Sequence, residues 1–409
     1  MKKLTIGLIL VLLAAGMAGC VGIPGVVNLM KGVSAQKVTA KPIDTAFEEN
    51  LANFSINLFQ KSVTDKQNSL ISPLSVSQAL AMTANGADGE TLSQMEQVLG
   101  GIPIDDLNGY FLGYVQKLPS GGKTKFHIAN SIWYRDDLRV QKDFLGVNAA
   151  YYHAEAYQSA FDDQTVNAIN SWAKSNTEGM IDKLLDTIDN EDVMYLINAV
   201  TFDSKWANPY EKDDIHKDTF VDINGAKKTV DFMHSEEAKY LDDGKATGFI
   251  RPYSSGYSFV ALLPNKDVST AGYIQSLTGA GFLQTIQNAK ECKVYVDLPK
   301  FTYDYAIQLK EPLIVLGMPD AFSNSADFAK MIAPTDNSVN ISKVLHKTYI
   351  SVDEEGTKAG AITLFTVMSN APTMVDESVI LNRPFLYAII DNQTDLPIFL
   401  GTVMTIDQQ

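Results

Sequence analysis

Apolar residues recur along this chain with two different periods, and together these periods predict a mixture of helices and strands. A helical spacing joins Phe47, Leu51, Phe54, Leu58 and Phe59. Residues 47–59 are therefore expected to form an amphipathic helix. The segment 193–202 is almost entirely apolar, as in a strand that is buried on both faces. Asn198 is the polar exception within it, and a buried amide without partners costs about 1–3 kcal/mol, so Asn198 is expected to anchor a polar network.

Other segments of the same kinds occur along the rest of the chain. Further helices are predicted at 76–84, 91–99 and 167–174. Further strands are predicted at 69–75, 126–134, 226–233, 249–252, 258–263, 294–298, 341–352, 379–380, 384–390 and 397–404. Helices and strands follow one another without a regular alternation, which favours one large α+β domain over a doubly wound sheet.

The stretch from Val352 to Ser378 carries two local signals that disagree. Small residues occupy one set of alternate positions, and the other set is mixed. The small set is Thr357, Ala359, Ala361 and Thr363, and the mixed set is Lys358, Gly360, Ile362 and Leu364. This alternation is typical of a strand that packs closely on one face, yet the stretch lies between an acidic turn and a proline-containing polar segment, where an exposed loop is expected. Such a conflict favours a functional segment; the alternative is an ordinary edge strand followed by a loop.

The N-terminus has the pattern of a targeting segment. Lys2 and Lys3 precede an apolar run, and small residues lead to Cys20, which predicts a signal peptide over residues 1–19. The residues M-A-G-C at 17–20 resemble the lipoprotein signal of prokaryotes, in which the cysteine is lipidated. Residues 20–42 are then a lipidated tether and residues 43–409 the globular domain. The protein is expected to be secreted and held at the cell surface or on a periplasm-facing membrane; the alternative is an ordinary signal peptide with an incidental cysteine.

Composition and charge exclude several classes of function. Of the 409 residues 45% are hydrophobic, which is ample for a large core, and the formal net charge is −15 with a pI near 4.8. An acidic chain without a basic stripe does not favour nucleic acid as a partner. The two cysteines provide no disulfide framework. The five histidines include no H-x-x-x-H pair, so neither a metal site nor a cofactor is expected.

Motifs of enzymes are absent or incomplete in the sequence. The chain contains neither the G-x-S-x-G motif of hydrolases nor a glycine-rich phosphate loop. Residues 171–174, S-W-A-K, match the S-x-x-K of serine β-lactamases, but the accompanying S-D-N and K-T-G motifs do not follow. No catalytic residue is therefore assigned, and the protein is not expected to be an enzyme.

Six segments in order resemble the serpin family of peptidase inhibitors. They are S-L-I-S-P-L-S-V-S-Q-A-L-A-M-T-A-N-G-A (69–87), V-M-Y-L-I-N-A-V-T-F-D-S-K-W (193–206), V-D-L-P-K-F (296–301), L-G-M-P-D-A-F (316–322), I-S-K-V-L-H-K-T-Y-I-S-V-D-E-E-G-T-K-A (341–359) and N-R-P-F-L-Y-A-I-I (382–390). The resemblance extends from about residue 43 to 404. It implies a serpin fold of three β-sheets with eight or nine helices and an exposed reactive loop, and a monomeric protein.

The resemblance also implies a suicide mechanism of inhibition. A peptidase cleaves the reactive loop and forms an acyl-enzyme, and the loop then inserts as a new strand in the main sheet while the peptidase stays covalently trapped. The expected partner is a serine peptidase of the elastase or chymotrypsin type, because residues 364–371 contain no Lys or Arg. A cysteine peptidase is the other candidate. The alternative function is a non-inhibitory, binding or chaperone-like serpin whose loop is only a substrate.

Four groups of residues acquire roles through the resemblance. The hinge, where insertion begins, comprises Glu354, Glu355, Gly356, Thr357, Lys358, Ala359, Gly360, Ala361, Ile362 and Thr363. The shutter beneath the main sheet comprises Ser72, Ser75, Asn198 and His346. The breach at the top of the sheet comprises Trp206, Lys300 and Glu354, with an ion pair expected between the last two. Counting Glu354 as the seventeenth residue before the cleaved bond places that bond between Asn370 and Ala371, with Met368 and Ser369 as alternatives.

Overall fold

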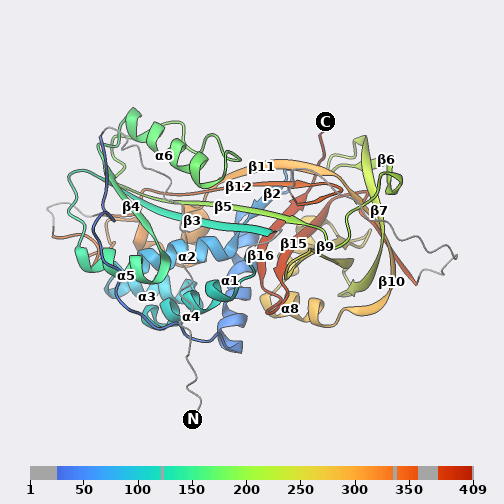
Figure 1. The fold of residues 1–409 in the computed structure, drawn as a ribbon, viewed down its shortest axis with the longest axis horizontal. Coiled ribbons are helices and arrows are strands. Elements are labelled where there is room, and N and C mark those ends of the chain that lie inside the picture. The colour runs from blue at the N-terminus through green and yellow to red at the C-terminus, as the bar shows by residue number, and fades with distance from the viewer. Residues whose placement is uncertain (1–24, 121–123, 335–338, 358–375, 408–409) are drawn as a thin grey trace, which may run out of the picture.

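Seven strands form the main sheet of the computed structural model, which describes residues 25–120, 124–334, 339–357 and 376–407 (Figure 1). In spatial order they are β1 (Val26–Asn28), β4 (Glu155–Ser159), β3 (Thr124–Arg135), β5 (Met194–Lys205), β13 (Gly356–Thr357), β12 (Lys343–Val352) and β11 (Phe301–Gln308). β5 lies at the centre of this order and is buried from Met194 to Phe202, as its apolar sequence predicts.

Nine further strands form a second continuous ladder. Eight of them follow the order β14 (Glu377–Ile380), β10 (Lys290–Pro299), β7 (Lys227–Asp242), β8 (Ala246–Pro252), β9 (Tyr257–Pro264), β15 (Phe385–Asp391), β16 (Pro397–Val403) and β2 (Ser69–Ile71), and β6 (Ile215–Val221) pairs with β7. β7 is 16 residues long, and it pairs with β6 and β10 along most of its length but with β8 only at residues 240–242. The two smaller sheets implied by the resemblance are thus joined by β7, and the α+β class is confirmed.

Nine α-helices lie within the described ranges, in agreement with the implied eight or nine. They are α1 (Thr45–Ser62), α2 (Pro73–Ala84), α3 (Gly89–Val98), α4 (Ile104–Lys117), α5 (Lys142–Tyr152), α6 (Asp163–Asn176), α7 (Thr270–Ser276), α8 (Gly279–Gln287) and α9 (Lys310–Leu316). α6 covers one face of the main sheet, and α1 and α2 lie on the opposite side (Figure 1). Trp172 of α6 belongs to one apolar cluster with Tyr195 of β5, whereas Leu196 of β5 belongs to the larger cluster on the other face. β5 is therefore apolar on both faces because each face has its own core.

Five of these helices, α4, α5, α7, α8 and α9, were not predicted from the sequence, and α2 begins earlier than predicted. The structure shows the reason for α2 and for α4. α2 begins at Pro73, three residues before the predicted start. Proline is well tolerated there because backbone N–H groups in the first helical turn have no intrahelical hydrogen-bond partner, so the missing N–H of proline costs nothing. α4 was not predicted, since Gly109 and Gly113 lower its helical propensity. A Cβ on Gly113 would lie 1.9 Å from the carbonyl oxygen of Lys41, and the Lys41 N–H donates to the Gly109 oxygen at 2.9 Å. The close approach of two backbones explains these glycines.

Residues 25–42 belong to the predicted tether, and the first part of this segment packs against the domain. Residues 26–28 pair antiparallel with residues 157–159 of β4 and form an edge strand of the main sheet. Leu29, Met30 and Val33 pack against the larger core. The apolar residues here follow neither the helical nor the strand period, so the sequence carried no signal for this contact.

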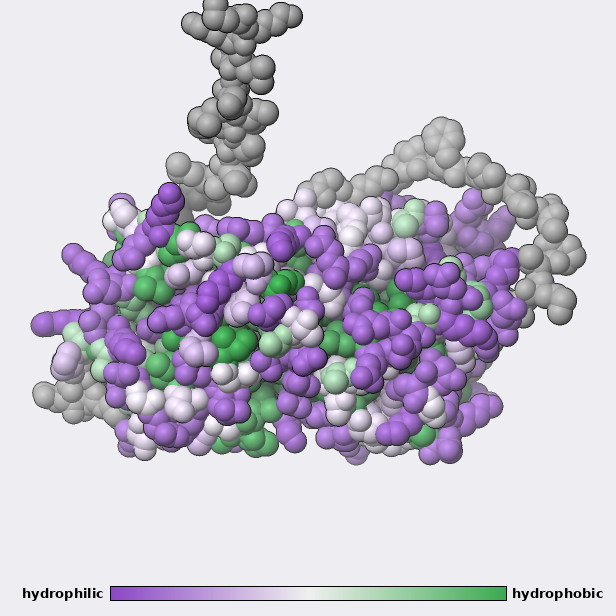
Figure 2. Space-filling model, turned by 90° about the horizontal axis from the view of Figure 1, so that it is seen from below, coloured by the Kyte–Doolittle hydropathy of each residue, from purple (hydrophilic) through white to green (hydrophobic). Residues whose placement is uncertain are grey.

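The surface in Figure 2 is mostly hydrophilic, and hydrophobic residues on this face lie in small separate patches. Patches of that size are ordinary for a folded domain. Within the described ranges, no helix combines the length and the apolarity needed to cross a membrane.

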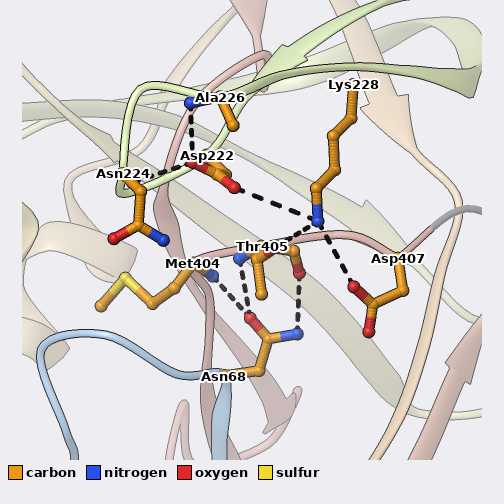
Figure 3. Close-up of polar contacts among 8 residues, drawn as sticks. All are labelled: Asn68, Asp222, Asn224, Ala226, Lys228, Met404, Thr405 and Asp407. Atoms are coloured by element: carbon orange, nitrogen blue, oxygen red, sulfur yellow. Dashed lines mark hydrogen bonds and ion pairs between the residues drawn. The ribbon is translucent and has the colours of Figure 1, made fainter.

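Polar contacts fix the segment that follows β16 to two distant parts of the chain (Figure 3). The amide oxygen of Asn68 accepts from the N–H groups of Met404 and Thr405 at 2.7 and 3.0 Å, and its nitrogen donates to the Thr405 carbonyl at 2.9 Å. Lys228 Nζ donates to the Thr405 hydroxyl at 2.8 Å and lies 3.3 Å from an oxygen of Asp407. The end of the last strand is therefore held both beside β2 and beside β7.

Candidate functional site

A short piece of the hinge stands between the two central strands of the main sheet. β5 and β12 are parallel, and their pairing extends as far as Val200 and Thr348. Beyond this point β13 separates them, because Thr357 pairs antiparallel with Ser204 of β5 and with Val352 of β12. The sheet is thus closed between its central strands at one end and opened by the hinge at the other.

Gly356 allows the hinge to approach β5 closely. A Cβ at this position would lie 2.2 Å from the Ser204 carbonyl oxygen and 2.7 Å from the Lys205 Cα. Both contacts are with backbone atoms, which cannot move aside as a flexible side chain can. Only glycine therefore fits where β13 begins.

The turn that leads from β12 into β13 is stabilised by Asp353, which was not among the residues singled out from the sequence. Its carboxylate accepts from the N–H groups of Glu355 and Gly356 at 2.9 and 3.2 Å, and its own N–H donates to the Gly356 oxygen at 3.0 Å. Burial raises the pKa of Asp353, although these backbone N–H groups partly oppose the effect. The D-x-E-G pattern of a side-chain-capped turn is the signal that could have found it.

The predicted ion pair at the breach is present, and a second one accompanies it. Lys300 Nζ donates to Glu354 Oε2 at 2.5 Å, and Lys205 Nζ donates to Glu355 Oε2 at 3.1 Å. Burial alone would raise the pKa of Glu354, but the hydrogen bond from Lys300, a backbone N–H and the charge of Lys300 together outweigh burial and lower that pKa. The two acidic hinge residues are thereby attached to the last residue of β5 and to the residue between β10 and β11.

Trp206 joins the hinge to the rest of the breach. Its indole N–H donates to the backbone carbonyl oxygen of Asp353 at 2.9 Å, and its backbone N–H donates to the backbone carbonyl oxygen of Glu355 at 3.0 Å. The Tyr210 N–H donates to the Glu354 oxygen at 3.0 Å. The three consecutive carbonyls of Asp353, Glu354 and Glu355 therefore accept hydrogen bonds from the segment that follows β5. These contacts bring the three predicted breach residues together around the turn that enters the hinge.

A chain of hydrogen bonds crosses the sheet at the predicted shutter. The Ser72 N–H donates to His346 Nε2 at 3.1 Å, so His346 Nδ1 carries the proton and donates to Asn198 Oδ1 at 2.5 Å. The Asn198 amide nitrogen donates to Asn130 Oδ1. The network thus joins the N-terminus of α2 to β12, β5 and β3. Asn130 was missed because only the strand register places it opposite Asn198.

The polar groups of the shutter are deeply buried. Burial lowers the pKa of His346 from 6.5 to about 3, so its imidazole is neutral at physiological pH. The hydroxyls of Ser72 and Ser75 are buried without a hydrogen-bond partner among the described residues. Ser72 therefore contributes to the network through its backbone rather than through its side chain, and the Ser75 side chain makes no hydrogen bond among the described residues.

Part of the predicted site lies outside the described residues. This applies to the hinge residues Lys358, Ala359, Gly360, Ala361, Ile362 and Thr363, to the reactive-bond candidates Met368, Ser369, Asn370 and Ala371, and to Cys20. Of the small set in the hinge, Thr357 is described, and its side chain is buried.

Comparison with known proteins matches this architecture to one family. The model of the family described as Serpin (serine protease inhibitor) matches residues 49–406. The chain belongs to the serpin family. A serpin-like protein of Thermococcus kodakarensis, itself uncharacterised, is 28% identical over 374 residues, which is 89% of this chain and 86% of that protein.

Two solved structures of the thermophilic serpin tengpin share 52% sequence identity with this serpin. The native-state structure has a TM-score of 0.90 and covers 93% of this chain and 100% of that one. The latent-state structure has a TM-score of 0.81 and covers 90% and 100%. The present conformation is therefore more similar to the native than to the latent state of tengpin.

Proposed function

We propose that this serpin is an irreversible suicide inhibitor of peptidases. The observation that carries the proposal is β13, the two-residue hinge strand that stands antiparallel between the parallel strands β5 and β12. Loop insertion has to begin at this place and in this orientation. The hinge therefore occupies the first position of the strand that the cleaved loop would extend.

In the proposed reaction the peptidase nucleophile attacks the carbonyl carbon of Asn370. The peptide bond to Ala371 breaks, and the amine of Ala371 leaves with a proton from the peptidase, so that an acyl-enzyme remains. The freed loop continues the strand begun by Thr357 and replaces the six residue pairs between β5 and β12 by two ladders. At a net of roughly 1 kcal/mol per hydrogen bond, a dozen inserted residues stabilise the product by on the order of 10 kcal/mol, comparable with the stability of a whole domain.

The shutter would have to rearrange during this insertion. His346 and Asn198 lie directly opposite each other on β12 and β5, so a strand that enters between them separates their side chains. Each of the two polar groups then needs a new partner, because an unpaired buried group costs about 1–3 kcal/mol. The network therefore opposes premature opening and allows it only when the inserted strand compensates.

The proposed target is a serine peptidase of the elastase or chymotrypsin type. The uncharged run at residues 364–371 supports this choice, since it offers no basic residue to a trypsin-like pocket. Cleavage after Asn370 would instead suit an asparagine-preferring cysteine peptidase. The N-terminal signal supports a prokaryotic lipoprotein that is secreted and anchored to the membrane through Cys20. A monomer is proposed from the resemblance to the serpins. Labelling with a palmitate analogue that is lost in Cys20→Ser tests the anchor.

A panel of peptidases analysed on denaturing gels tests the inhibitory function. A covalent band with the summed mass of the serpin fragment and the peptidase is expected, and mass spectrometry of the released C-terminal fragment locates the cleaved bond. Thr357→Arg should be cleaved without a covalent band, because the buried Thr357 site has no room for a long charged side chain. Clean cleavage of the wild-type protein, with active peptidase remaining, would instead support the non-inhibitory alternative.

A further inference from the structure

The hinge hydroxyl that enters the main sheet has a partner from the other ladder of strands. The Thr357 side chain is 1% exposed, and its Oγ1 lies 2.5 Å from the hydroxyl of Tyr253. Tyr253 follows the last residue of β8 and forms an isolated β-bridge with Trp206. Among the described residues, the Tyr253 hydroxyl makes no other hydrogen bond. The first inserted position is thus joined to a residue outside the sheet that receives it.

The Tyr253 ring is held in place by aromatic neighbours. It stacks on Trp206 with centroids 4.5 Å apart and an interplanar angle of 7°, and it meets Phe202 edge-on at 5.2 Å. The Tyr253 N–H donates to the Tyr257 oxygen at 2.9 Å. A buried and stacked ring keeps its hydroxyl at one point, so the hydroxyl can select one position of Thr357.

We infer that Tyr253 is a positioning residue that sets how much of the population holds the hinge inserted in the main sheet. The role rests on the proposed function, because it governs the strand from which loop insertion continues. When the hinge is in the sheet, both hydroxyls are satisfied by each other. When the hinge leaves, the Thr357 hydroxyl reaches water and the Tyr253 hydroxyl loses its partner in the described structure. Removal of the Tyr253 hydroxyl should therefore shift the hinge toward the released state.

Hydrogen exchange of the full-length protein measures this shift without any peptidase. The backbone N–H groups of Trp206 and Tyr210 donate to the hinge carbonyls of Glu355 and Glu354, so their exchange requires release of the hinge. Tyr253→Phe keeps both ring contacts and removes only the hydroxyl. Exchange at these two amides should become about fivefold faster, the factor expected for one buried hydrogen bond.

Two further variants make the test specific. Tyr257→Phe removes a neighbouring tyrosine hydroxyl that donates to the Pro119 oxygen at 3.0 Å, and it should leave both amides within twofold of the wild type. Thr357→Val removes the other hydroxyl of the pair, so the double variant Tyr253→Phe/Thr357→Val should exchange no faster than Thr357→Val alone. The amide of Leu196, in the closed part of β5, should not respond in any of them.

Several results would overturn the role of Tyr253. These are unchanged exchange in Tyr253→Phe, additive effects in the double variant, equal acceleration at Leu196, or a wild-type Trp206 amide that exchanges as fast as an unprotected one. The exchange measurement can nevertheless fail or succeed separately from the test for a covalent complex. If the protein forms no covalent complex but shows the expected exchange, the role of Tyr253 stands and the inhibitory mechanism fails. If it forms the complex but the exchange is unchanged in Tyr253→Phe, the inhibitory mechanism stands and the role of Tyr253 fails.

Discussion

His346 is a neutral imidazole in the interior of the main sheet, and its surroundings leave it no room to become charged. Its two ring nitrogens are used by the Ser72 N–H and by Asn198 Oδ1, and both contacts are made by one tautomer of the neutral ring. Protonation of His346 at Nε2 would place a second ring N–H facing the Ser72 N–H and remove the acceptor that this N–H uses. At the scale of single residues, the shutter is therefore sensitive to acid.

The first prediction concerns the pH dependence of stability. The pKa of His346 is about 3 in the folded protein against an ordinary value of 6.5, so below pH 6.5 the unfolded chain binds a proton that the folded protein does not. Stability should fall as the pH is lowered from about 6.5 to about 3, by roughly 4–5 kcal/mol from this residue. Urea unfolding of His346→Gln should show a smaller loss over that range.

The exposed His127 provides the matched control for this measurement. His127→Gln changes an exposed side chain on β3 and should keep the acid-induced loss of the wild-type protein. Equal pH profiles for His346→Gln and His127→Gln would contradict the assignment to His346.

A second prediction at the residue scale concerns Gly356. In Gly356→Ala the new Cβ would overlap the backbone of β5, so the hinge should leave the sheet and the Trp206 amide should exchange roughly tenfold faster or more. Gly146→Ala is the control, because the nearest atom to its new Cβ is 3.9 Å away. Equal exchange in the two variants would show that Gly356 is not needed for the docked hinge.

At the scale of elements, the last strand depends on contacts made beyond its own end. β16 pairs with β15 and with the three-residue β2, and the following segment is fixed by Asn68 and Lys228 (Figure 3). Asn68 alone makes three hydrogen bonds to backbone groups there. The side chain therefore replaces part of the ladder that the short β2 does not provide.

The third prediction follows from these contacts. Asn68→Ala should lower the free energy of unfolding by about 2 kcal/mol, because it leaves two N–H groups and one carbonyl group of the C-terminal segment without their partner. Asn265→Ala removes a single exposed contact to the Gly244 oxygen and should change stability by less than about 0.5 kcal/mol. Urea midpoints compare the two, and equal midpoints would contradict the role of Asn68.

At the scale of the whole molecule, the main sheet is incompletely paired as it stands. β5 and β12 pair over six residues, and β13 adds two residues at the open end. Completion of the sheet by the loop would convert a parallel central pair into antiparallel ladders, which are slightly more stable per residue. Stability of the intact protein is therefore expected to lie well below that of the cleaved one.

The fourth prediction is a change in thermal stability after cleavage of the reactive loop. A gain on the order of 10 kcal/mol corresponds to a rise in Tm of roughly 10–15 °C for a chain of this size. Scanning calorimetry of the intact and the cleaved protein measures it. Cleaved Thr357→Arg should show a much smaller rise, and an unchanged Tm of the cleaved wild-type protein would exclude insertion.

Much of the fold could be predicted because local pattern and tertiary environment agree. The apolar run of β5 and the helical period of α1 correspond to burial that the structure contains, and Asn198 was recognisable as a buried amide that needs partners. Motifs shared with the serpins added the shutter and breach residues. Predictions were poorer where a segment depends on a distant neighbour, as in α4, whose glycines fit the backbone at Lys41.

The sequence by itself determined the fold class and the family, because apolar period and motif order are properties of the chain alone; the hinge with its small residues stays a prediction from the same sequence. Only the tertiary structure decided that the hinge already stands in the sheet, that Asn130 extends the shutter, that Asp353 and Tyr253 hold the hinge, and that residues 26–28 complete the sheet edge. The reason is physical. These roles arise from strand register and from contacts between residues far apart in the chain, and neither leaves a periodic signal in the sequence.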